Sequence, residues 1–326
     1  MVNEETKVVH VSIIIVSWNT RQITCDCLRS IYGQSGINNY EVIVLDNASS
    51  DGSVQMIKHD FPDVFLIENK ENRGFAAANN QGIAIAKGRY ILLLNSDTVI
   101  LDNAIGKTVS FAEAHPEAAV IGCRVLNPDK TLQPTCFMFP SVLNLILSST
   151  YLYKLFPRSR FFGREHMTWW DRSDEHEVDV VTGCFMLVRN EAIEQVGMMD
   201  ERFFVYGEET DWCYRFKQAG WKVMFTPCAE IIHLGGQSSK KIATEMALQL
   251  RGSILQFINK HRPRWEYVLA CFLMWLFCAV RIPFWFVCFL LSRQDRKYNW
   301  GRMKIYAIGA WRIITAGGKA LCMRVK

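Results

Sequence analysis

Three carboxylates lie within four residues of this chain, at Glu208, Glu209 and Asp211. Aromatic residues precede them in the segment FFVYG, and Trp212 follows them. An apolar setting raises the pKa of a carboxyl group, and a neighbouring negative charge raises it further. A carboxylate tuned in this way can act as a general base. The same residues are also typical of the first turn of a helix, where acids need no catalytic role.

A second set of candidates follows hydrophobic runs. Asn95, Ser96 and Asp97 come directly after the run YILLL, where a carboxylate can bind a divalent cation together with a diphosphate. Turn chemistry explains such a segment as well. His233 ends another apolar run, and a histidine there is more often structural, although beside a metal it can serve as a ligand.

Two further polar segments suit a nucleotide. Asp46 opens the segment DNASSDG, which could hydrogen-bond a nucleobase or ribose, although ordinary turns explain most such clusters. Arg73 and Gly74 precede an alanine-rich stretch, where a cation and a helix N-terminus favour phosphate. A packed alanine-rich helix with a glycine at its entry explains these residues equally well.

The elements that must position these residues alternate along the chain. We expect strands at 11–16, 41–45, 64–67, 90–94, about 118–125, 178–188, 222–225 and 231–233. We expect helices at about 21–32, from a cap at 49–53 to residue 59, at 75–86, near 142–155 and at 213–219. This alternation predicts a parallel α/β sheet, in which ligands bind at the carboxyl ends of the strands. Asp46 and Asp97 both fall at such ends.

Composition separates a body from a tail. Half of the 326 residues are hydrophobic, and the net charge of +5 combines about −5 in residues 1–260 with +10 in residues 261–326. The eleven cysteines include no CxxC pair, which indicates reduced thiols in a cytosolic compartment. Residues 1–10 are polar and predict no signal peptide.

The basic tail also contains apolar runs, which favour a membrane over nucleic acid as its partner. The run 267–280 is interrupted at 281–283 and resumes at 284–291, with basic residues on both sides. By the positive-inside rule we expect both ends to stay cytoplasmic, with a kinked helix or hairpin in the inner leaflet and a last helix at about 300–314. A tilted span with Arg281 buried, or a helix packed on the body or on a second subunit, are the alternatives. We therefore divide the chain into a catalytic domain, 1–255, and a membrane-associated tail, 256–326.

Seven motifs in order resemble one family. They are IIVSWN at 14–19, Asp46 with DGS at 51–53, NRG at 72–74, NSD at 95–97, TGC at 182–184, EETD at 208–211, and His233. This order over residues 10–240 is similar to that of inverting family-2 glycosyltransferases with a GT-A fold, a Rossmann-like and mostly parallel sheet flanked by helices. The nearest likeness is to bacterial rhamnosyltransferases that build cell-surface polysaccharides.

The resemblance implies a role for each matching position. Nucleotide-sugar binding is implied for Ser17, Asn19, Asp46, Arg73, Gly74, Asn95 and Asp97; Mg²⁺ or Mn²⁺ binding for Asp97 and His233; and acceptor binding for Gly183, Cys184 and Trp212. Asn95 replaces the first aspartate of the family's DXD motif, so that Asp97 is the carboxylate ligand left in that motif. Glu209 stands where the family has the aspartate of its Glu-Asp motif and is expected to be the base, beside Glu208 and with Asp211 as its rival.

The implied reaction is a single displacement that inverts the anomeric carbon. The expected donor is dTDP-rhamnose or another dTDP- or UDP-sugar, and the expected acceptor is a lipid-linked or growing glycan at the cytoplasmic face of the membrane. We expect no nucleic-acid partner and leave a homo-oligomer open. A non-catalytic scaffold that binds sugar-nucleotides or glycans is the alternative. A nucleotidyltransferase would need a glycine-rich basic loop after the first strand, and SWNTR at 17–21 is not such a loop.

Overall fold

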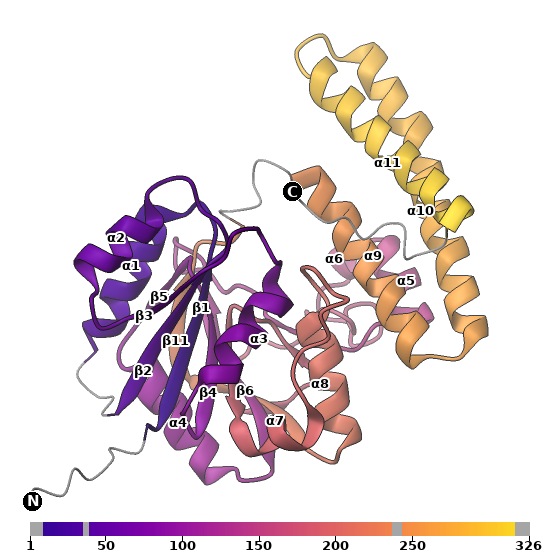
Figure 1. Cartoon of the computed structure of the whole chain (residues 1–326). Coiled ribbons are helices and arrows are strands. Elements are labelled where there is room, and N and C mark those ends of the chain that lie inside the picture. Colours follow the sequence, from indigo (N-terminus) through magenta and orange to yellow (C-terminus); the bar gives the residue numbers. More distant parts are fainter. Residues whose placement is uncertain (1–8, 35–38, 237–242, 317–326) are drawn as a thin grey trace, which may run out of the picture.

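The computed structural model describes residues 9–34, 39–236 and 243–316 (Figure 1). The strands are β1 (Val11–Ser17), β2 (Tyr40–Asp46), β3 (Phe65–Glu68), β4 (Tyr90–Asn95), β5 (Thr98–Ile100), β6 (Ala118–Leu126), β7 (Cys136–Phe137), β8 (His176–Glu177), β9 (Val180–Val181), β10 (Phe185–Arg189) and β11 (Lys222–His233). The helices are α1 (Arg21–Tyr32), α2 (Ser53–Asp60), α3 (Phe75–Ile85), α4 (Ala104–Ala114), α5 (Val142–Ser149), α6 (Leu152–Leu155), α7 (Asn190–Val196), α8 (Glu208–Gln218), α9 (Ala243–His261), α10 (Arg264–Leu291) and α11 (Arg296–Ala316).

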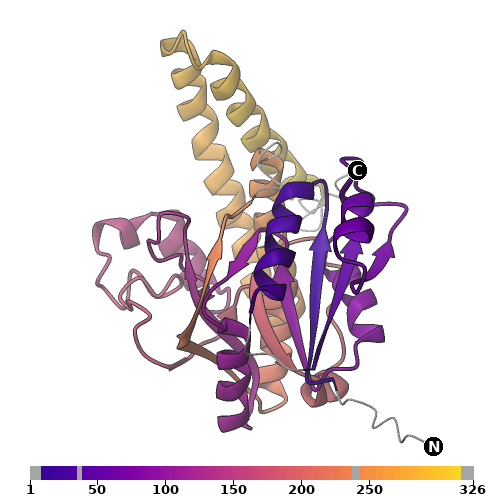
Figure 2. The ribbon, with the colours of Figure 1, turned by 90° about the vertical axis from the view of Figure 1, so that its left-hand side faces the viewer.

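Nine of the described strands form one sheet, in the order β3-β2-β1-β4-β10-β6-β11-β5, with β8 paired to β11. The pairs β3–β2, β2–β1, β1–β4 and β6–β11 are parallel, whereas β10, β5 and β8 run antiparallel to their neighbours. Figure 2 shows the indigo and purple strands of the first half side by side, with their arrowheads at the same end. The predicted α/β sheet is confirmed, and its second half is mixed rather than parallel.

Helices cover both faces of the sheet. The face that carries Ile13 and Ile15 of β1 packs against α1, α2 and α4. The opposite face, which carries Ile14, packs against α3, α7 and α8. Because successive side chains of a strand point to opposite faces, a strand covered on both sides is apolar throughout. This explains the β-branched run that marked β1 in the sequence.

Some element boundaries differ from those we predicted. The expected strand 178–188 is interrupted at residues 182–184, between β9 and β10. The expected strands 222–225 and 231–233 are one strand, β11, with an irregularity in its pairing between Thr226 and Glu230. The helix α8 begins at Glu208, five residues before the predicted start, so the acidic residues occupy its first turn. The helix expected at 142–155 is divided into α5 and α6 at Tyr151, where φ is 56°.

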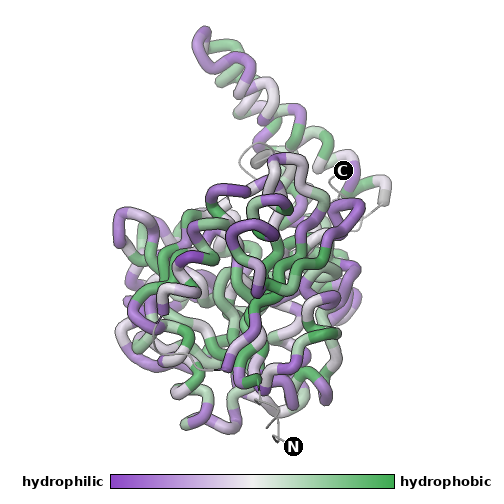
Figure 3. The backbone as a smooth tube through the Cα atoms, turned by 60° about the vertical axis from the view of Figure 1, so that its left-hand side comes forward, coloured by the Kyte–Doolittle hydropathy of each residue, from purple (hydrophilic) through white to green (hydrophobic). Residues whose placement is uncertain are grey.

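The C-terminal helices form a separate layer. Leu255 of α9, Met274 of α10 and Tyr306 of α11 belong to a third hydrophobic cluster. The helices α10 and α11 form an antiparallel hairpin that projects from the body, with a hydrophilic tip (Figures 1 and 3). The break expected at 281–283 is absent, because α10 continues through Pro283 as one helix, and the hairpin forms between α10 and α11 instead. The predicted domain boundary at 255/256 falls inside α9, which ends at His261.

The helix α10 presents an apolar stripe to the outside. Among the described helices it is long and apolar enough to cross a membrane, with 28 residues. Exposed side chains recur along it every three or four residues, at Val268, Phe272, Leu276, Val280, Phe284, Val287 and Leu291. A continuous exposed stripe of this kind marks an interaction surface rather than a solvated face.

Candidate active site

The loops that follow β1 and β2 lie side by side because the two strands are parallel, with Ser17 in register with Asp46. The Ser50 N–H donates to Asn19 Oδ1 at 2.8 Å, and the Ser49 N–H donates to Asp46 Oδ2 at 2.8 Å. Asp46 Oδ1 is buried and has no hydrogen-bond partner among the described residues. The loops therefore fix one oxygen of Asp46 and leave the other as an unpaired, buried acceptor.

Ser17 lies deeper than its neighbours. Its side chain is fully buried, and its hydroxyl lies 2.9 Å from Thr24 Oγ1 and 3.3 Å from Thr20 Oγ1. The Thr20 hydroxyl in turn lies 3.4 Å from Ser96 Oγ. The Ser17 hydroxyl thus joins the first strand to α1, and only the main chain of Ser17 lies near the loop ends.

Gly74 joins the β2 loop to the segment that precedes α8. Its φ is 81°, and a Cβ atom there would collide with the carbonyl oxygen of Phe204. The Phe75 N–H donates to this same carbonyl at 2.7 Å, and Asn47 Nδ2 donates to the Gly74 carbonyl at 3.1 Å. Glycine is required here by both its φ and the close approach. Arg73 is exposed beside this junction and can reach an anionic ligand.

The ends of β4 and β11 bring Asp97 and His233 together across the sheet. Asp97 Oδ1 lies 3.1 Å from His233 Nε2, and Asn95 Nδ2 lies 3.3 Å from the same nitrogen. Gln133 Oε1 lies 2.6 Å from His233 Nδ1 and can accept its proton. With that proton on Nδ1, the lone pair of Nε2 points towards Asp97. Gln133 is a residue that the sequence analysis missed.

These atoms fit a divalent cation. Two ligands at about 2.1 Å from Mg²⁺ at right angles would be roughly 3 Å apart, close to the observed separation of Asp97 Oδ1 and His233 Nε2. A histidine that ligates a metal usually donates its other ring N–H to a neighbour, which is the place of Gln133. Nowhere in the described residues do three or more His, Cys, Asp or Glu side chains gather to hold a metal by themselves. Asp97 and His233 would therefore bind the ion with ligands from elsewhere, such as diphosphate oxygens.

The residues Asn19, Asp46, Arg73, Gly74, Asn95, Asp97 and His233 thus belong to the loops and strand ends at this side of the sheet, and we refer to them as the strand-end cluster. Next to it, the Asn95 N–H donates to the Cys184 carbonyl at 3.1 Å, and Gly183 faces the ring of Phe75. The Thr182–Cys184 segment therefore forms the border of the cluster.

The three acids of α8 have different surroundings. Asp211 is fully buried, and its oxygens accept from Arg215 Nε at 2.9 Å, Lys260 Nζ at 2.5 Å and His261 Nε2 at 2.7 Å. Burial opposes the charge of Asp211, but these hydrogen bonds outweigh it and lower its pKa. A carboxylate clamped by three nitrogen donors between α8 and α9 is a poor base, which disfavours Asp211 as the rival of Glu209.

Glu208 and Glu209 lack such partners. Burial raises the pKa of both, and the neighbouring Glu209 raises that of Glu208 further. Glu208 Oε2 and Glu209 Oε2 are both buried without a hydrogen-bond partner among the described residues. Burial therefore favours the neutral form of both carboxyl groups.

Glu209 lines a cavity of about 330 Å³ between α8, α9 and the segment around residues 137–166. The cavity is lined by Phe137, Met138, Pro140, Glu165, His166, Val180, Thr182, Tyr206, Gly207, Glu209, Thr210, Leu250, Ser253, Ile254 and Phe257. We refer to it as the α8 cavity. Thr182 connects it to the strand-end cluster, because Cys184, two residues later, accepts from Asn95. Residues 250, 253, 254 and 257 share one face of α9, so this helix supplies a wall.

The predicted acceptor residues lie outside this cavity. Trp212 is fully buried in the core, where its Nε1–H donates to the Gly197 carbonyl at 2.8 Å. Cys184 is also buried, and burial raises the pKa of its thiol to about 11. Gly183 borders Phe75 instead of the cavity. Within the TGC motif, Thr182 lines the cavity, whereas Gly183 and Cys184 do not. The motif itself gave no reason to choose Thr182 over the other two as an acceptor-binding residue.

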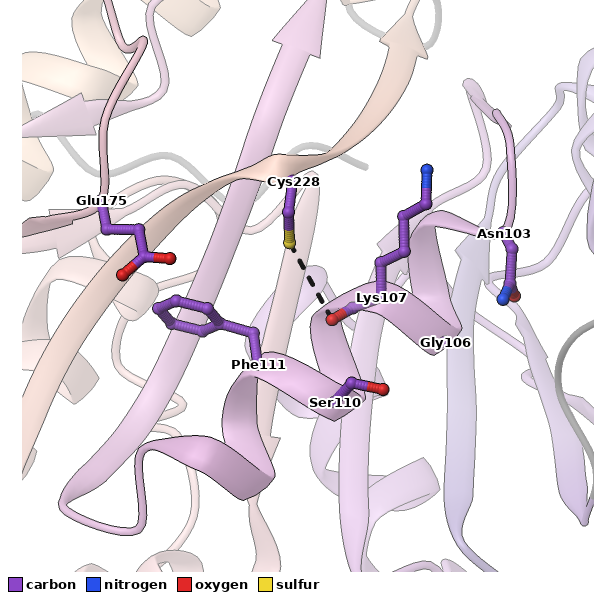
Figure 4. A pocket seen from close by; sticks show the side chains of 7 residues that line it. All are labelled: Asn103, Gly106, Lys107, Ser110, Phe111, Glu175 and Cys228. Carbon is purple, nitrogen blue, oxygen red and sulfur yellow. Dashed lines mark hydrogen bonds between the residues drawn. The ribbon is translucent and has the colours of Figure 1, made fainter.

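A second pocket, of about 450 Å³, lies between α4 and the irregular part of β11 (Figure 4). Its lining includes Lys107, Glu175 and the exposed Cys228, whose thiol lies 4.0 Å from the Lys107 carbonyl. None of the residues predicted from the sequence contributes to it. The chemistry-bearing residues therefore gather at the strand-end cluster and the α8 cavity.

Comparison with known sequences agrees with this arrangement. A model of the family described as "Glycosyl transferase family 2" matches residues 12–197. The N-acetylglucosaminyl-diphospho-decaprenol L-rhamnosyltransferase of Mycobacterium tuberculosis is 26% identical over 240 residues, which are 69% of this chain and 76% of that protein. The low-salt glycan biosynthesis hexosyltransferase Agl10 of Haloferax volcanii is 26% identical over 235 residues, which are 71% of this chain and 69% of that protein.

Solved structures share the fold. The mannosyltransferase PcManGT of Pyrobaculum calidifontis, in complex with GDP-Man and Mn²⁺, superposes with a TM-score of 0.55 at 16% identity, over 94% of this chain and 87% of that one. GalNAc-T7 with UDP, GalNAc and Mn²⁺ gives 0.53 at 13% identity, over 78% and 51%. These likenesses confirm the predicted GT-A fold. Together with the match over more than half of its length, they identify the chain as a member of glycosyl transferase family 2 and hence as a glycosyltransferase.

Proposed function

We propose that this glycosyltransferase moves rhamnose from dTDP-rhamnose to a lipid-linked glycan acceptor, with inversion at the anomeric carbon, in the synthesis of a cell-surface polysaccharide. The observation that carries the proposal is the position of Glu209. Its carboxyl group has a raised pKa and lines a cavity together with Thr182, two residues before Cys184, whose carbonyl accepts from the Asn95 N–H of the strand-end cluster. The choice of donor and acceptor rests on the mycobacterial relative, whose name specifies a rhamnosyl transfer to a decaprenol-linked sugar.

The strand-end cluster would hold the nucleotide. The unpaired oxygen of Asp46 would accept a hydrogen bond from the base, and the exposed Arg73 would neutralise part of the diphosphate charge. Asp97 and His233 would hold Mg²⁺ or Mn²⁺, which supplies charge neutralisation of the departing diphosphate. Gln133 would keep the His233 ring in the orientation that ligation needs.

Glu209 would remove the proton from the attacking hydroxyl of the acceptor. Because burial raises its pKa, it is a stronger base than an exposed carboxylate. Glu208 beside it would stay protonated, so that the site would not carry a second negative charge. The acceptor oxygen would then bond to the anomeric carbon from the face opposite the diphosphate, which inverts the configuration.

The hairpin would seat the enzyme on the cytoplasmic face of the membrane. The exposed stripe of α10 is entirely apolar, whereas Arg293 in the turn and Arg296 and Lys297 at the start of α11 are basic. An apolar surface flanked by cations favours an anionic bilayer. A membrane position also suits an acceptor that is itself anchored by a polyprenyl chain.

A donor screen tests the proposal. Purified full-length protein in detergent would be incubated with Mg²⁺ or Mn²⁺ and a panel of dTDP-, UDP- and GDP-sugars, with and without a prenyl-linked N-acetylglucosaminyl diphosphate. We expect release of dTDP from dTDP-rhamnose, faster with the acceptor and stopped by a chelator. Release from another donor would correct the sugar. If folded protein released no nucleoside diphosphate from any donor, the result would instead favour a scaffold that only binds its ligands.

A further inference from the structure

The α8 cavity contains a second carboxyl group that the mechanism above does not use. Glu165 comes from the irregular segment between α6 and β8, and it lines the same cavity as Glu209. Burial raises the pKa of Glu165 to about 7, against a hydrogen bond from Ser148 that lowers it. Its Oε2 is buried and has no hydrogen-bond partner among the described residues.

The rest of the cavity wall does not compensate this carboxyl group. No lysine or arginine is among the described residues of the lining, and burial lowers the pKa of the neighbouring His166, which keeps that ring neutral. Most of the other walls are apolar, including Val180, Leu250 and Phe257. A buried carboxyl oxygen without a partner is costly, and such groups in native proteins usually have an explanation in function.

The chemistry of the lining restricts what can bind. Two carboxyl groups without a nearby cation repel a diphosphate, so the donor's phosphates belong at the strand-end cluster. Apolar walls beside hydrogen-bond acceptors suit a sugar ring, which has an apolar C–H face and a rim of hydroxyl donors. The volume of about 330 Å³ is at the small end of ligand sites, which favours one sugar unit.

We propose that Glu165 is an acceptor-binding residue, which accepts a hydrogen bond from a second hydroxyl or amide N–H of the acceptor sugar while Glu209 faces the attacking hydroxyl. This inference rests on the proposed function. The attacking oxygen gives its proton to Glu209 and bonds to the anomeric carbon, and the carbon–oxygen bond to the diphosphate breaks with its electron pair. Glu165 transfers no proton and only fixes which hydroxyl is presented.

Initial rates test this assignment. They would be measured against the concentration of a synthetic N-acetylglucosaminyl diphosphate with a short prenyl chain, in wild-type protein and in the Glu165→Gln and Glu165→Ala variants. We expect Glu165→Ala to raise the KM for this acceptor roughly ten- to a hundredfold, the effect of losing a hydrogen bond to a charged group. The KM for the donor and the slow hydrolysis of donor without acceptor should stay within about twofold, which a general structural defect would not allow.

Two controls sharpen the result. Ser148→Ala removes the hydrogen bond to Glu165 but keeps its carboxyl group, and should change the acceptor KM less than about threefold. Acceptor analogues that each lack one hydroxyl or amide provide the second control. Wild-type and Glu165→Ala protein should use one of these analogues equally well, because removing the sugar group and removing Glu165 break the same hydrogen bond.

The outcomes separate this inference from the function on which it rests. Transfer by wild-type protein with an unchanged acceptor KM in Glu165→Ala overturns the role of Glu165 alone. A parallel fall in transfer, donor hydrolysis and melting temperature in the isosteric Glu165→Gln variant assigns Glu165 to structure and also overturns the role. An absence of transfer by wild-type protein to this acceptor and to the rest of the panel overturns the proposed function and this inference together.

Discussion

The strand-end cluster and the α8 cavity differ in how far hydrogen bonds fix their polar groups. In the cluster, Asn19, Asp46 and Gly74 accept hydrogen bonds of 2.8 to 3.1 Å, and one oxygen of Asp46 has no partner. In the cavity, Glu165 and Glu209 each keep a buried oxygen without a partner. The first arrangement fixes a polar surface in advance for a large, charged ligand. The second keeps carboxyl groups at a raised pKa, ready to accept a proton or a hydrogen bond.

The contrast extends to neighbouring residues of one helix. Asp211 lies on the buried stripe of α8 and is neutralised by α9, whereas Glu209 is turned towards the cavity. A displacement of two residues along the chain therefore separates a structural carboxylate from a candidate base.

The largest effect is expected from Glu209→Gln. Loss of the base should lower kcat for transfer by about 100- to 10,000-fold, while the dissociation constant of the nucleoside diphosphate changes less than about threefold. Steady-state rates and calorimetric titration would measure the two quantities. Turnover close to that of the wild type would show that the cavity carboxylate is not the base.

Asp211→Asn should act on stability instead. Removing this buried charge leaves Arg215 with backbone carbonyls and Lys260 with Asp200 as their remaining partners, and breaking a buried ion pair in this way typically costs about 3 to 5 kcal/mol. The lowered pKa of Asp211 also means that its contribution is present above the unfolded pKa and is lost as the pH falls through the folded one. Thermal unfolding in detergent at several pH values checks both statements. An unchanged melting temperature would contradict the clamp.

Gln133→Ala probes the strand-end cluster. Residues that orient a metal-ligating histidine usually contribute 10- to 100-fold to metal affinity, so the Mn²⁺ concentration for half-maximal binding should rise by about that factor. Titration calorimetry in the presence of nucleoside diphosphate gives the value without relying on turnover. As a control, Gln34→Ala removes an amide that bonds to the Asn103 N–H, and should leave metal binding unchanged.

Glu208→Gln is expected to give the smallest change. A carboxyl group whose pKa is raised on folding weakens stability as the pH rises from its unfolded pKa towards the folded one. The variant should therefore unfold at a slightly higher temperature than the wild type at pH 7 and at the same temperature at pH 4. A lower melting temperature at pH 7 would show that the charge of Glu208 is stabilised by groups outside its described contacts.

The strand-end cluster could largely be predicted from the sequence. Asp46 and Asp97 directly follow buried strands, and parallel strands bring such ends to one edge. The direction of the Ser17 side chain was harder to predict, because a one-residue step along a strand turns a side chain to the other face. The start of α8 at Glu208 lies before the predicted start at residue 213, because the aromatic and glycine residues that precede Glu208 give no clear helix boundary.

The α8 cavity could not be predicted in the same way. Its walls come from segments around residues 137, 165, 180, 209 and 254, and no local pattern brings these together. The local sequence does not distinguish the surroundings of Asp211 from those of Glu209. The difference arises because α9 places Lys260 and His261 against Asp211. Gln133 reaches His233 across 100 positions from an irregular segment that carried no motif.

Both faces of α9 are packed, which limits how the enzyme can be shortened. One face of this helix closes the α8 cavity through Leu250 and Phe257, and Leu248, Leu255 and Ile258 join the cluster shared with the hairpin. A chain cut after His261 would keep the cavity wall but expose that apolar surface to water, and a cut before α9 would open the cavity. A soluble, active fragment would therefore need polar substitutions on the hairpin side of α9 alone.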